Sequence, residues 1–140
     1  MFETFDHTAD LGLRVTADSL NELFAEAAVG LASLIVADVA SVKSSQQRSI
    51  EISSPDLEYL YFDWLSELLY LFESEGLLAT DADVEVDGTS LRAVVDVDTF
   101  CETHHRRSHE VKAITYHGLM VEPHESDRKQ SWTAEVIVDI

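Results

Sequence analysis

The sequence predicts an α+β fold in which a largely antiparallel β-sheet packs with two main α-helices, in a single domain over residues 1–140. The first observation behind this prediction is the order of the elements: strands come first, helices follow, and most of the second half has strand patterns. The second is that both helices begin with capping signals. The third is length, because 140 residues suffice for one hydrophobic core but not for two independent ones.

The first quarter of the chain predicts a strand followed by a helix. Residues 2–5 are a short apolar start, and residues 11–15 alternate between apolar and other side chains, as in a half-buried strand. Ser19 begins the helix, because Glu22 completes a capping box three residues later. Apolar residues recur at helical spacing from there to Ile35, so this helix is expected to bury one face.

A second helix is predicted after a loop at residues 40–47 and a strand at residues 48–53. Ser54-Pro55 favours a helix start with proline in the first helical position, and Gly76 favours an end after Glu75. The apolar stripe is wider than one core face requires. It comprises Leu57, Leu60, Tyr61, Trp64, Leu65, Leu68 and Phe72, flanked by Tyr59, Phe62, Leu69 and Tyr70. We interpret this helix as packed between a sheet and the first helix, and the alternative is a groove for a partner.

The second half of the chain has mostly strand patterns. Residues 84–86 and 91–95 flank an Asp87-Gly88 turn signal, which is typical of a hairpin. Further strands are predicted at residues 111–116, 119–121 and 132–140, and a loop at residues 122–131.

The charge of the chain excludes several classes of function. Acidic residues outnumber basic residues by 27 to 9, and the formal net charge is −18. Nucleic-acid binding relies on Lys and Arg to neutralise phosphates, so we expect no direct binding to RNA or DNA and repulsion from anionic membranes. Cations and basic protein surfaces are the expected partners. The acid excess also suits a salt-rich cytoplasm, which is a hypothesis about the host and not about function.

Composition and motifs also bear on location and activity. No apolar run approaches the roughly 20 residues that span a bilayer. The N-terminus has no basic region and no signal-like apolar core, so we expect a cytoplasmic protein. Cys101 is the single cysteine, which excludes an intramolecular disulfide. The P-loop, GxGxxG, GxSxG and HExxH motifs are all absent, and we expect no enzyme.

Two acidic segments could hold a hard cation. Asp6, His7 and Asp10 lie just before the first predicted strand, and carboxylate oxygens suit Ca²⁺ or Mg²⁺. The alternative is a turn in which an aspartate hydrogen-bonds its own backbone. Asp139, the carbonyl or carboxylate of Ile140 and one distant aspartate would likewise form an oxygen-rich site. The alternative there is an exposed acidic strand end.

Two further groups of residues have functional and structural interpretations. Lys112 and His117 flank an apolar strand, where a lysine could hold an anion or an acidic group of a partner, or simply form a surface salt bridge. A polar stretch at residues 99–110 contains the spacing C-x2-H-H-x3-H, which invites a zinc hypothesis. The four residues are Cys101, His104, His105 and His109. The stretch lacks a CxxC pair and contains two arginines, so a basic surface loop is favoured.

Five segments in order along the chain resemble the archease family. The opening motif is Asp6-His7-Thr8-Ala9-Asp10-Leu11-Gly12-Leu13. The others are Ser19-Leu20-Asn21-Glu22-Leu23-Phe24 with Ala27-Ala28, Trp64-Leu65-Ser66-Glu67-Leu68-Leu69-Tyr70-Leu71, Val111-Lys112-Ala113-Ile114-Thr115-Tyr116-His117, and Val136-Ile137-Val138-Asp139-Ile140. Each segment alone is weak, whereas five in register are specific.

The resemblance implies a function that the residues alone do not. Archeases are small α+β proteins that assist the RtcB-type RNA ligase, which joins RNA ends in tRNA splicing or RNA repair using GTP and a divalent metal. They promote guanylylation of the ligase and restore its multiple turnover without being ligases. The resemblance implies a divalent cation at Asp10, Asp139 and Ile140, with calcium as the expected ion and Mg²⁺ or Mn²⁺ as alternatives.

Four further residues match motif positions of the family without a defined role. Asp6, His7, Lys112 and His117 match motif positions of the family and are candidates for contact with a partner or for support of the metal ligands. The alternative function is a general chaperone or modulator of RNA-modifying enzymes, with the wide aromatic helix as its client surface. An orphan metal-dependent hydrolase is a third hypothesis, and it lacks a visible general base.

Overall fold

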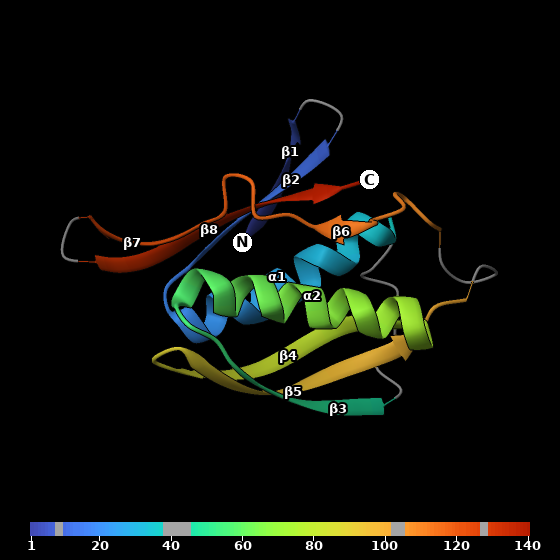
Figure 1. The fold of residues 1–140 in the computed structure, drawn as a ribbon, viewed down its shortest axis with the longest axis horizontal. Helices are drawn as coiled ribbons and strands as arrows, with labels where there is room; N and C mark the ends of the chain where they lie inside the picture. The colour runs from blue at the N-terminus through green and yellow to red at the C-terminus, as the bar shows by residue number, and fades with distance from the viewer. Residues whose placement is uncertain (8–9, 38–45, 102–105, 127–128) are drawn as a thin grey trace.

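The computed structural model describes residues 1–7, 10–37, 46–101, 106–126 and 129–140. Its strands form two antiparallel sheets, and two helices lie between them (Figure 1). The predicted class, an α+β fold with antiparallel strands and two main helices, is confirmed. The division of the strands between two sheets was not predicted.

The first sheet contains the strands nearest to both ends of the chain. Its members are β1 (Phe2–His7), β2 (Asp10–Ala17), β8 (Lys129–Asp139), β6 (Ala113–Ile114) and β7 (Met120–Ser126). The order is β1-β2-β8, and both β6 and β7 pair with the other side of β8. Alternate side chains of β2 and β8, including Leu13 and Val136, are fully buried against the helices. The opposite face of the sheet carries the charged side chains discussed below.

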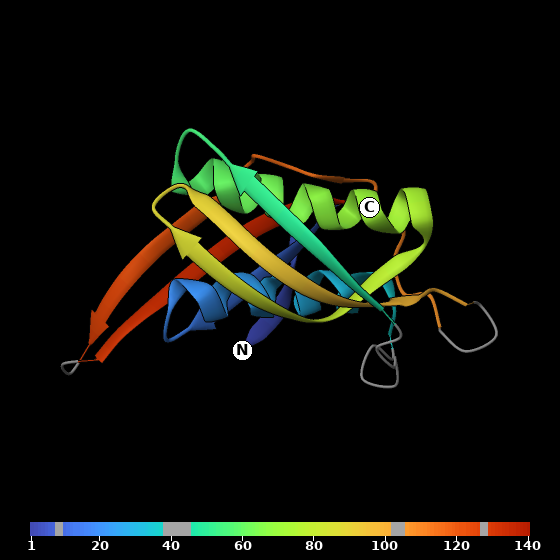
Figure 2. The same cartoon turned by 90° about the horizontal axis from the view of Figure 1, so that it is seen from below.

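The second sheet is formed by strands that are closer together in sequence. It contains β3 (Gln46–Ser53), β4 (Leu77–Asp87) and β5 (Ser90–Thr99), in the order β3-β5-β4. Figure 2 shows these strands lying across both helices. Gly88 adopts a positive φ of 62° in the tight β4–β5 turn, which confirms the predicted hairpin.

The two helices are α1 (Leu20–Ile35) and α2 (Leu57–Glu75). Ser19 caps α1 as predicted, with its hydroxyl accepting a hydrogen bond from the Glu22 amide at 3.1 Å. Gly76 ends α2 in the left-handed conformation, also as predicted.

The predicted start of α2 at Ser54-Pro55 is wrong. Asp56 is the N-cap, and its carboxylate accepts the Tyr59 amide at 2.8 Å. An ionised cap is favoured at the positive end of a helix. The hydroxyl of Ser54 instead donates to the carboxylate of Asp63 at 2.6 Å.

The wide apolar stripe of α2 is buried within the protein. Tyr61 and Trp64 have no exposed surface, and the indole of Trp64 donates to the Phe24 carbonyl of α1 at 2.9 Å. The helix lies between the two sheets and beside α1 (Figure 1). The interpretation as a core helix is therefore confirmed over most of the stripe. Two of the residues that flank the stripe, Tyr59 and Tyr70, are exposed.

Several predicted strand limits in the first sheet are wrong. The described residues of the predicted loop at 122–131 belong to strands, because β7 and the start of β8 form a hairpin that is largely exposed. An exposed hairpin needs no apolar alternation, so its composition is that of a loop. The strand predicted at 111–116 is shorter, since only Ala113 and Ile114 pair with β8.

The limits of the second sheet also differ from the prediction. β3 begins at Gln46 rather than at residue 48, so the end of the predicted loop belongs to this strand, and residues 40–45 lie outside the described part of the chain. β4 begins at Leu77 rather than at residue 84. A register shift between Ala79 and Asp81 interrupts the alternation of side chains, so the sequence pattern did not show the first half of this strand. No helix in the described part of the chain is long and apolar enough to cross a membrane.

Candidate functional site

The first motif segment forms the hairpin of β1 and β2. Asp6 pairs with Leu11, and His7 pairs with Asp10, at one end of the ladder. Residues 8 and 9 and the side chain of His7 lie outside the described part of the structure. The described residues of this segment therefore belong to two paired strands, and Asp10 begins the second of them.

Pairing of β2 with β8 places Asp10 directly opposite Asp139. Residues directly opposite one another in an antiparallel ladder point to the same face, with Cβ atoms roughly 4.5–5.5 Å apart. Both aspartates are half-buried. Like charges directly opposite each other are unfavourable in a sheet, and a cation bound between two carboxylates would offset their repulsion.

A third strand brings Lys112 to the same end of the sheet. Ala113 of β6 pairs with Asp139 on its other side, and the Lys112 amide donates to the Asp139 carbonyl at 2.7 Å. The Lys112 side chain is exposed and makes no ion pair with a carboxylate among the described residues. Ile140 follows directly after Asp139 and is half-buried, so its main-chain oxygen lies at the same strand end.

Not every predicted site residue shares this face. Asp6 is paired with Leu11, whose side chain is buried in the core, so strand alternation places Asp6 on the face opposite to Asp10. His117 is exposed in the turn after β6, where Gly118 has a φ of 67°. The hydroxyl and the amide of Thr115 both donate to the Ile137 carbonyl, at 2.8 and 3.0 Å, and hold this segment against β8.

The glycine of the first motif has a steric explanation. A Cβ added at Gly12 would overlap the ring of Phe5, which lies across the ladder on the same face. The guanidinium of Arg14 lies over this ring, 5.0 Å from its centroid. Gly12 therefore leaves room for the Phe5 ring on this face of the sheet, between Asp10 and Arg14 of the same strand.

A charged network that the sequence did not predict lies on the same face. Arg14 Nε donates to Glu135 Oε1 at 2.6 Å, and Nη1 donates to Glu3 Oε1 at 2.8 Å. The hydrogen bond to Glu3, followed by the hydrogen bond to Glu135 and the charge of that carboxylate, raises the pKa of Arg14 above its ordinary value. Alternation along the strand could have placed Arg14 on the face of Asp10, but its partner Glu135 depends on the β2–β8 register.

The zinc hypothesis gains no support. His104 and His105 lie outside the described residues, and the Nδ1 atom of His109 is 3.1 Å from the Leu34 carbonyl. Among the described residues, no group of three or more His, Cys, Asp or Glu side chains is arranged to hold a metal ion. The Asp10–Asp139 pair supplies two such side chains, so a metal there would need further oxygen ligands from the backbone or from water.

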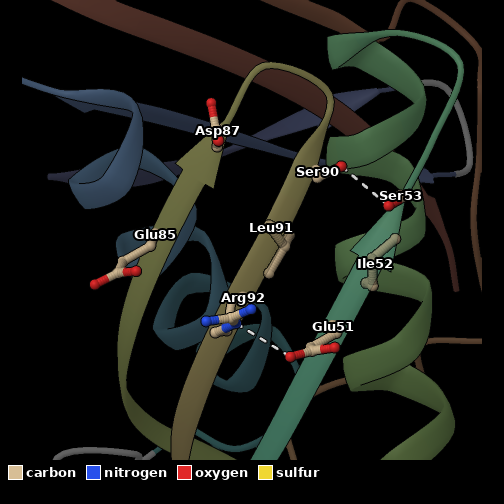
Figure 3. A pocket seen from close by; sticks show the side chains of 8 residues that line it. All are labelled: Glu51, Ile52, Ser53, Glu85, Asp87, Ser90, Leu91 and Arg92. Carbon is tan, nitrogen blue, oxygen red and sulfur yellow. Dashed lines mark hydrogen bonds and ion pairs between the residues drawn. The ribbon is translucent and has the colours of Figure 1, made fainter.

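A pocket lies on the second sheet, away from the aspartate pair (Figure 3). It has a volume of about 530 Å³ and is lined by Glu51, Ile52, Ser53, Glu85, Asp87, Ser90, Leu91 and Arg92. Arg92 Nε donates to Glu51 Oε1 at 3.1 Å, and the hydroxyls of Ser53 and Ser90 are 3.0 Å apart. Several of its polar groups thus pair with one another, and it contains none of the predicted site residues.

The whole chain is similar to proteins of one known family. The sequence model of the "Archease protein family (MTH1598/TM1083)" matches residues 2–140. The "Protein archease" of Pyrococcus abyssi is 36% identical over 143 residues, covering 99% of this chain and 98% of that protein. The "Protein archease" of Methanosarcina acetivorans is 35% identical over 144 residues, covering 99% of this chain and 95% of that protein.

Two solved structures have the same fold. The solution structure of Methanobacterium thermoautotrophicum protein 1598 is 33% identical, with a TM-score of 0.77 and coverage of 99% of this chain and 98% of that one. The crystal structure of a Thermotoga maritima protein, described as an archease and possible chaperone, is 19% identical, with a TM-score of 0.59 and coverage of 100% and 98%. The second likeness concerns the fold alone.

Proposed function

The chain belongs to the archease family, and we propose that it activates an RtcB-type RNA ligase without joining RNA ends itself. The activation would promote GTP-dependent guanylylation of the ligase and multiple turnover, in tRNA splicing or RNA repair. The observation that carries this proposal is the Asp10–Asp139 pair at one end of β2 and β8. We refer to this pair as the acidic tip, and the proposal places the contact with the ligase there.

The donor set at this tip fits a hard divalent cation. Asp10 and Asp139 offer carboxylate oxygens, Ile140 offers a main-chain oxygen, and Ca²⁺ prefers oxygen ligands over nitrogen or sulfur. Mg²⁺ and Mn²⁺ accept the same type of ligand. A bound cation would supply positive charge that stabilises phosphoryl oxygens. The two aspartates would hold and orient that charge toward the ligase.

Surrounding residues have separate roles in the proposal. Lys112 is exposed beside Asp139, and we assign it to contact with an acidic group of the ligase. His117, which lies further along the same segment, and Asp6, on the opposite face, are assigned to the rim of the contact. His7 is assigned there from its pairing with Asp10 alone.

The charge of the protein is compatible with this role. A net charge of −18 disfavours contact with RNA, so the activator would not compete with the ligase for its substrate. The alternative function, a general chaperone, relied on the wide stripe of α2 as a client surface. Most of that stripe is buried in the core, including Tyr61 and Trp64, so the ligase activator remains our proposal.

The test is a guanylylation and ligation assay with the cognate RtcB-type ligase, RNA ends, GTP and divalent metal. We expect wild-type protein at sub-stoichiometric amounts to raise product from about one per ligase to many. Asp10→Asn should lose this effect, and Arg14→Gln is the matched control, since it changes a charge on the same strand face. Activation by Asp10→Asn equal to that by wild type would rule out the acidic-tip mechanism.

A second measurement separates the metal from the activation. Calorimetry with Ca²⁺ or Mn²⁺ on the isolated protein should show one site in wild type and in Arg14→Gln, and a weakened site in Asp10→Asn and Asp139→Asn. Affinity should fall as acid protonates the ligands, which must be ionised to bind metal. If wild type fails to act on the ligase but prevents aggregation of unrelated proteins, the chaperone function replaces the proposal.

A further inference from the structure

Two of the exposed large hydrophobic side chains are in contact with each other on the protein surface. Tyr59 of α2 is 44% exposed, and Tyr116, in the turn after β6, is 40% exposed. Their ring centroids are 4.7 Å apart, and the Phe62 ring lies 5.0 Å from that of Tyr116. We refer to Tyr59, Phe62 and Tyr116 as the aromatic cluster.

The surroundings of the aromatic cluster are negatively charged. Asp56 and Glu58 lie at the first turn of α2, and neither forms an ion pair with a described cationic side chain. Partial desolvation raises the pKa of Tyr116 to about 12, and the neighbouring Tyr59, Asp56 and Glu58 add to this shift. The cluster thus combines partly exposed aromatic rings with carboxylates that have no described counter-ion.

Elsewhere the protein pairs aromatic rings with its own arginines. The guanidinium of Arg14 is 5.0 Å from the centroid of Phe5, and that of Arg107 is 5.7 Å from the centroid of Phe72. No described arginine or lysine lies over a ring of the aromatic cluster. A guanidinium is suited to this environment, because its planar face stacks on aromatic rings while its edge donates to carboxylates.

We propose that the aromatic cluster, with Asp56 and Glu58, is a docking site for an arginine side chain on the surface of the partner ligase. The identity of the partner rests on the proposed function. The position of the cluster is compatible with one contact area, because Lys112 and Tyr116 lie on the same segment, roughly 13 Å apart when extended. The Lys112 amide bonds to Asp139, so this segment leads from the acidic tip to the cluster.

The first test uses a peptide in place of the ligase. An acetylated Gly-Arg-Gly-Arg-Gly amide is titrated into the full chain while aromatic NMR signals are followed, with the lysine peptide of the same length beside it. We expect saturable shifts at the rings of Tyr59 and Tyr116 that exceed those at Tyr70, which is 61% exposed on the same helix. Binding should be tighter for arginine than for lysine. Equal shifts at all three tyrosines, or equal affinity for both peptides, would overturn the proposal.

The second test measures affinity for the cognate ligase. Tyr59→Ala and Glu58→Gln should each weaken binding about two- to fivefold, whereas Tyr70→Ala should bind as wild type does. All three positions are exposed on α2, so the fold is expected to be unchanged, and circular dichroism checks this. Ligase binding that is unchanged by Tyr59→Ala would overturn the docking site while leaving the proposed function intact. Arginine-peptide binding without any ligase binding would support the site and reject the proposed partner.

Discussion

The Arg14–Glu135 pair and the Asp10–Asp139 pair lie on the same face of the same two strands, four residues apart along each strand. In the first pair, opposite charges meet at 2.6 Å, and Glu3 adds a second acceptor to the arginine at 2.8 Å. In the second pair, two carboxylates occupy equivalent positions in the ladder. Cross-strand neighbours of opposite charge stabilise a sheet, and neighbours of like charge destabilise it.

This difference separates a structural pair from a candidate functional pair. The Arg14–Glu135 pair joins opposite charges across the two strands, whereas the Asp10–Asp139 pair places two like charges opposite each other. Strand geometry is the same at both positions, so the side chains alone create the difference. The two pairs do not differ in burial, because all four residues are half-buried. Substitutions at and around each pair separate the two cases, and their expected effects run from large to small.

The position between the two pairs should be the most sensitive to substitution. Gly12→Ala places a Cβ against the Phe5 ring, and overpacking of this kind costs about 1–3 kcal/mol of the free energy of unfolding. Urea denaturation measures the loss. In a Phe5→Ala background the same substitution should cost much less, because the ring is gone. Equal losses in both backgrounds would mean that Phe5 is not the obstacle.

Tyr61 extends the comparison to a polar group in the core. Its buried hydroxyl has no hydrogen-bond partner among the described residues, so Tyr61→Phe should raise the free energy of unfolding by about 1 kcal/mol. Tyr70→Phe, at an exposed position, should change little. A clear loss of stability in Tyr61→Phe would reveal a partner of this hydroxyl.

The same hydroxyl predicts a pH dependence. Burial raises the pKa of Tyr61, so its contribution is present below the unfolded-state value near 10 and is lost as the pH rises above it. Wild-type stability should therefore fall by up to about 1.4 kcal/mol per pH unit from this group in alkaline solution. Denaturation of wild type and Tyr61→Phe between neutral and alkaline pH measures the difference, and parallel curves would contradict the assignment.

The Arg14 network should contribute less than either of these sites. Arg14→Gln removes two ion pairs and the contact with Phe5, so the melting temperature should fall, and the fall should shrink at high salt because salt screens exposed pairs. Arg92→Gln is the matched control, since Arg92 pairs with Glu51 on the second sheet and both side chains are more than 70% exposed. A larger fall for Arg92→Gln would contradict the importance of the network.

Substitution in the aspartate pair should change the stability least, and its effect should be opposite in sign to that of Arg14→Gln. Without divalent metal, Asp10→Asn should stabilise the protein by a few tenths of a kcal/mol, because it relieves repulsion between like charges. Added Ca²⁺ should raise the melting temperature of wild type and not that of Asp10→Asn. Thermal denaturation with chelator and with Ca²⁺ measures both effects. Destabilisation in chelator would show that contacts of Asp10 within the protein outweigh its repulsion from Asp139.

Local patterns in the sequence predicted the elements that depend on neighbouring residues. The α1 cap at Ser19, the αL glycine at Gly76 and the β4–β5 turn at Gly88 all agree with the structure, because each depends on a few consecutive residues. The hairpin of β7 and β8 was predicted as a loop, because it offers no such local signal. Most of β7 and the first residues of β8 are exposed, so burial imposed no alternation there that a local pattern could reveal.

The candidate site could be predicted only in part. The resemblance to the archease family named Asp10, Asp139 and Ile140, but no spacing in the sequence places residue 10 opposite residue 139. The partners that support the site were not predicted either, since Glu135 and Thr115 act through their contacts with β2 and β8. A side chain that pairs with a distant charge or donates to a distant backbone carbonyl leaves no periodic pattern in the sequence.

By itself, the sequence determined the α+β class, the two amphipathic helices, the acidic character of the surface and the residues available as oxygen ligands. The tertiary structure decided which of these residues meet. Hydrogen bonding of β2 with β8 is a long-range pairing, and its register follows from burying one face of both strands against the helices. That register alone places two aspartates in opposition at one end and an arginine against a glutamate four residues away.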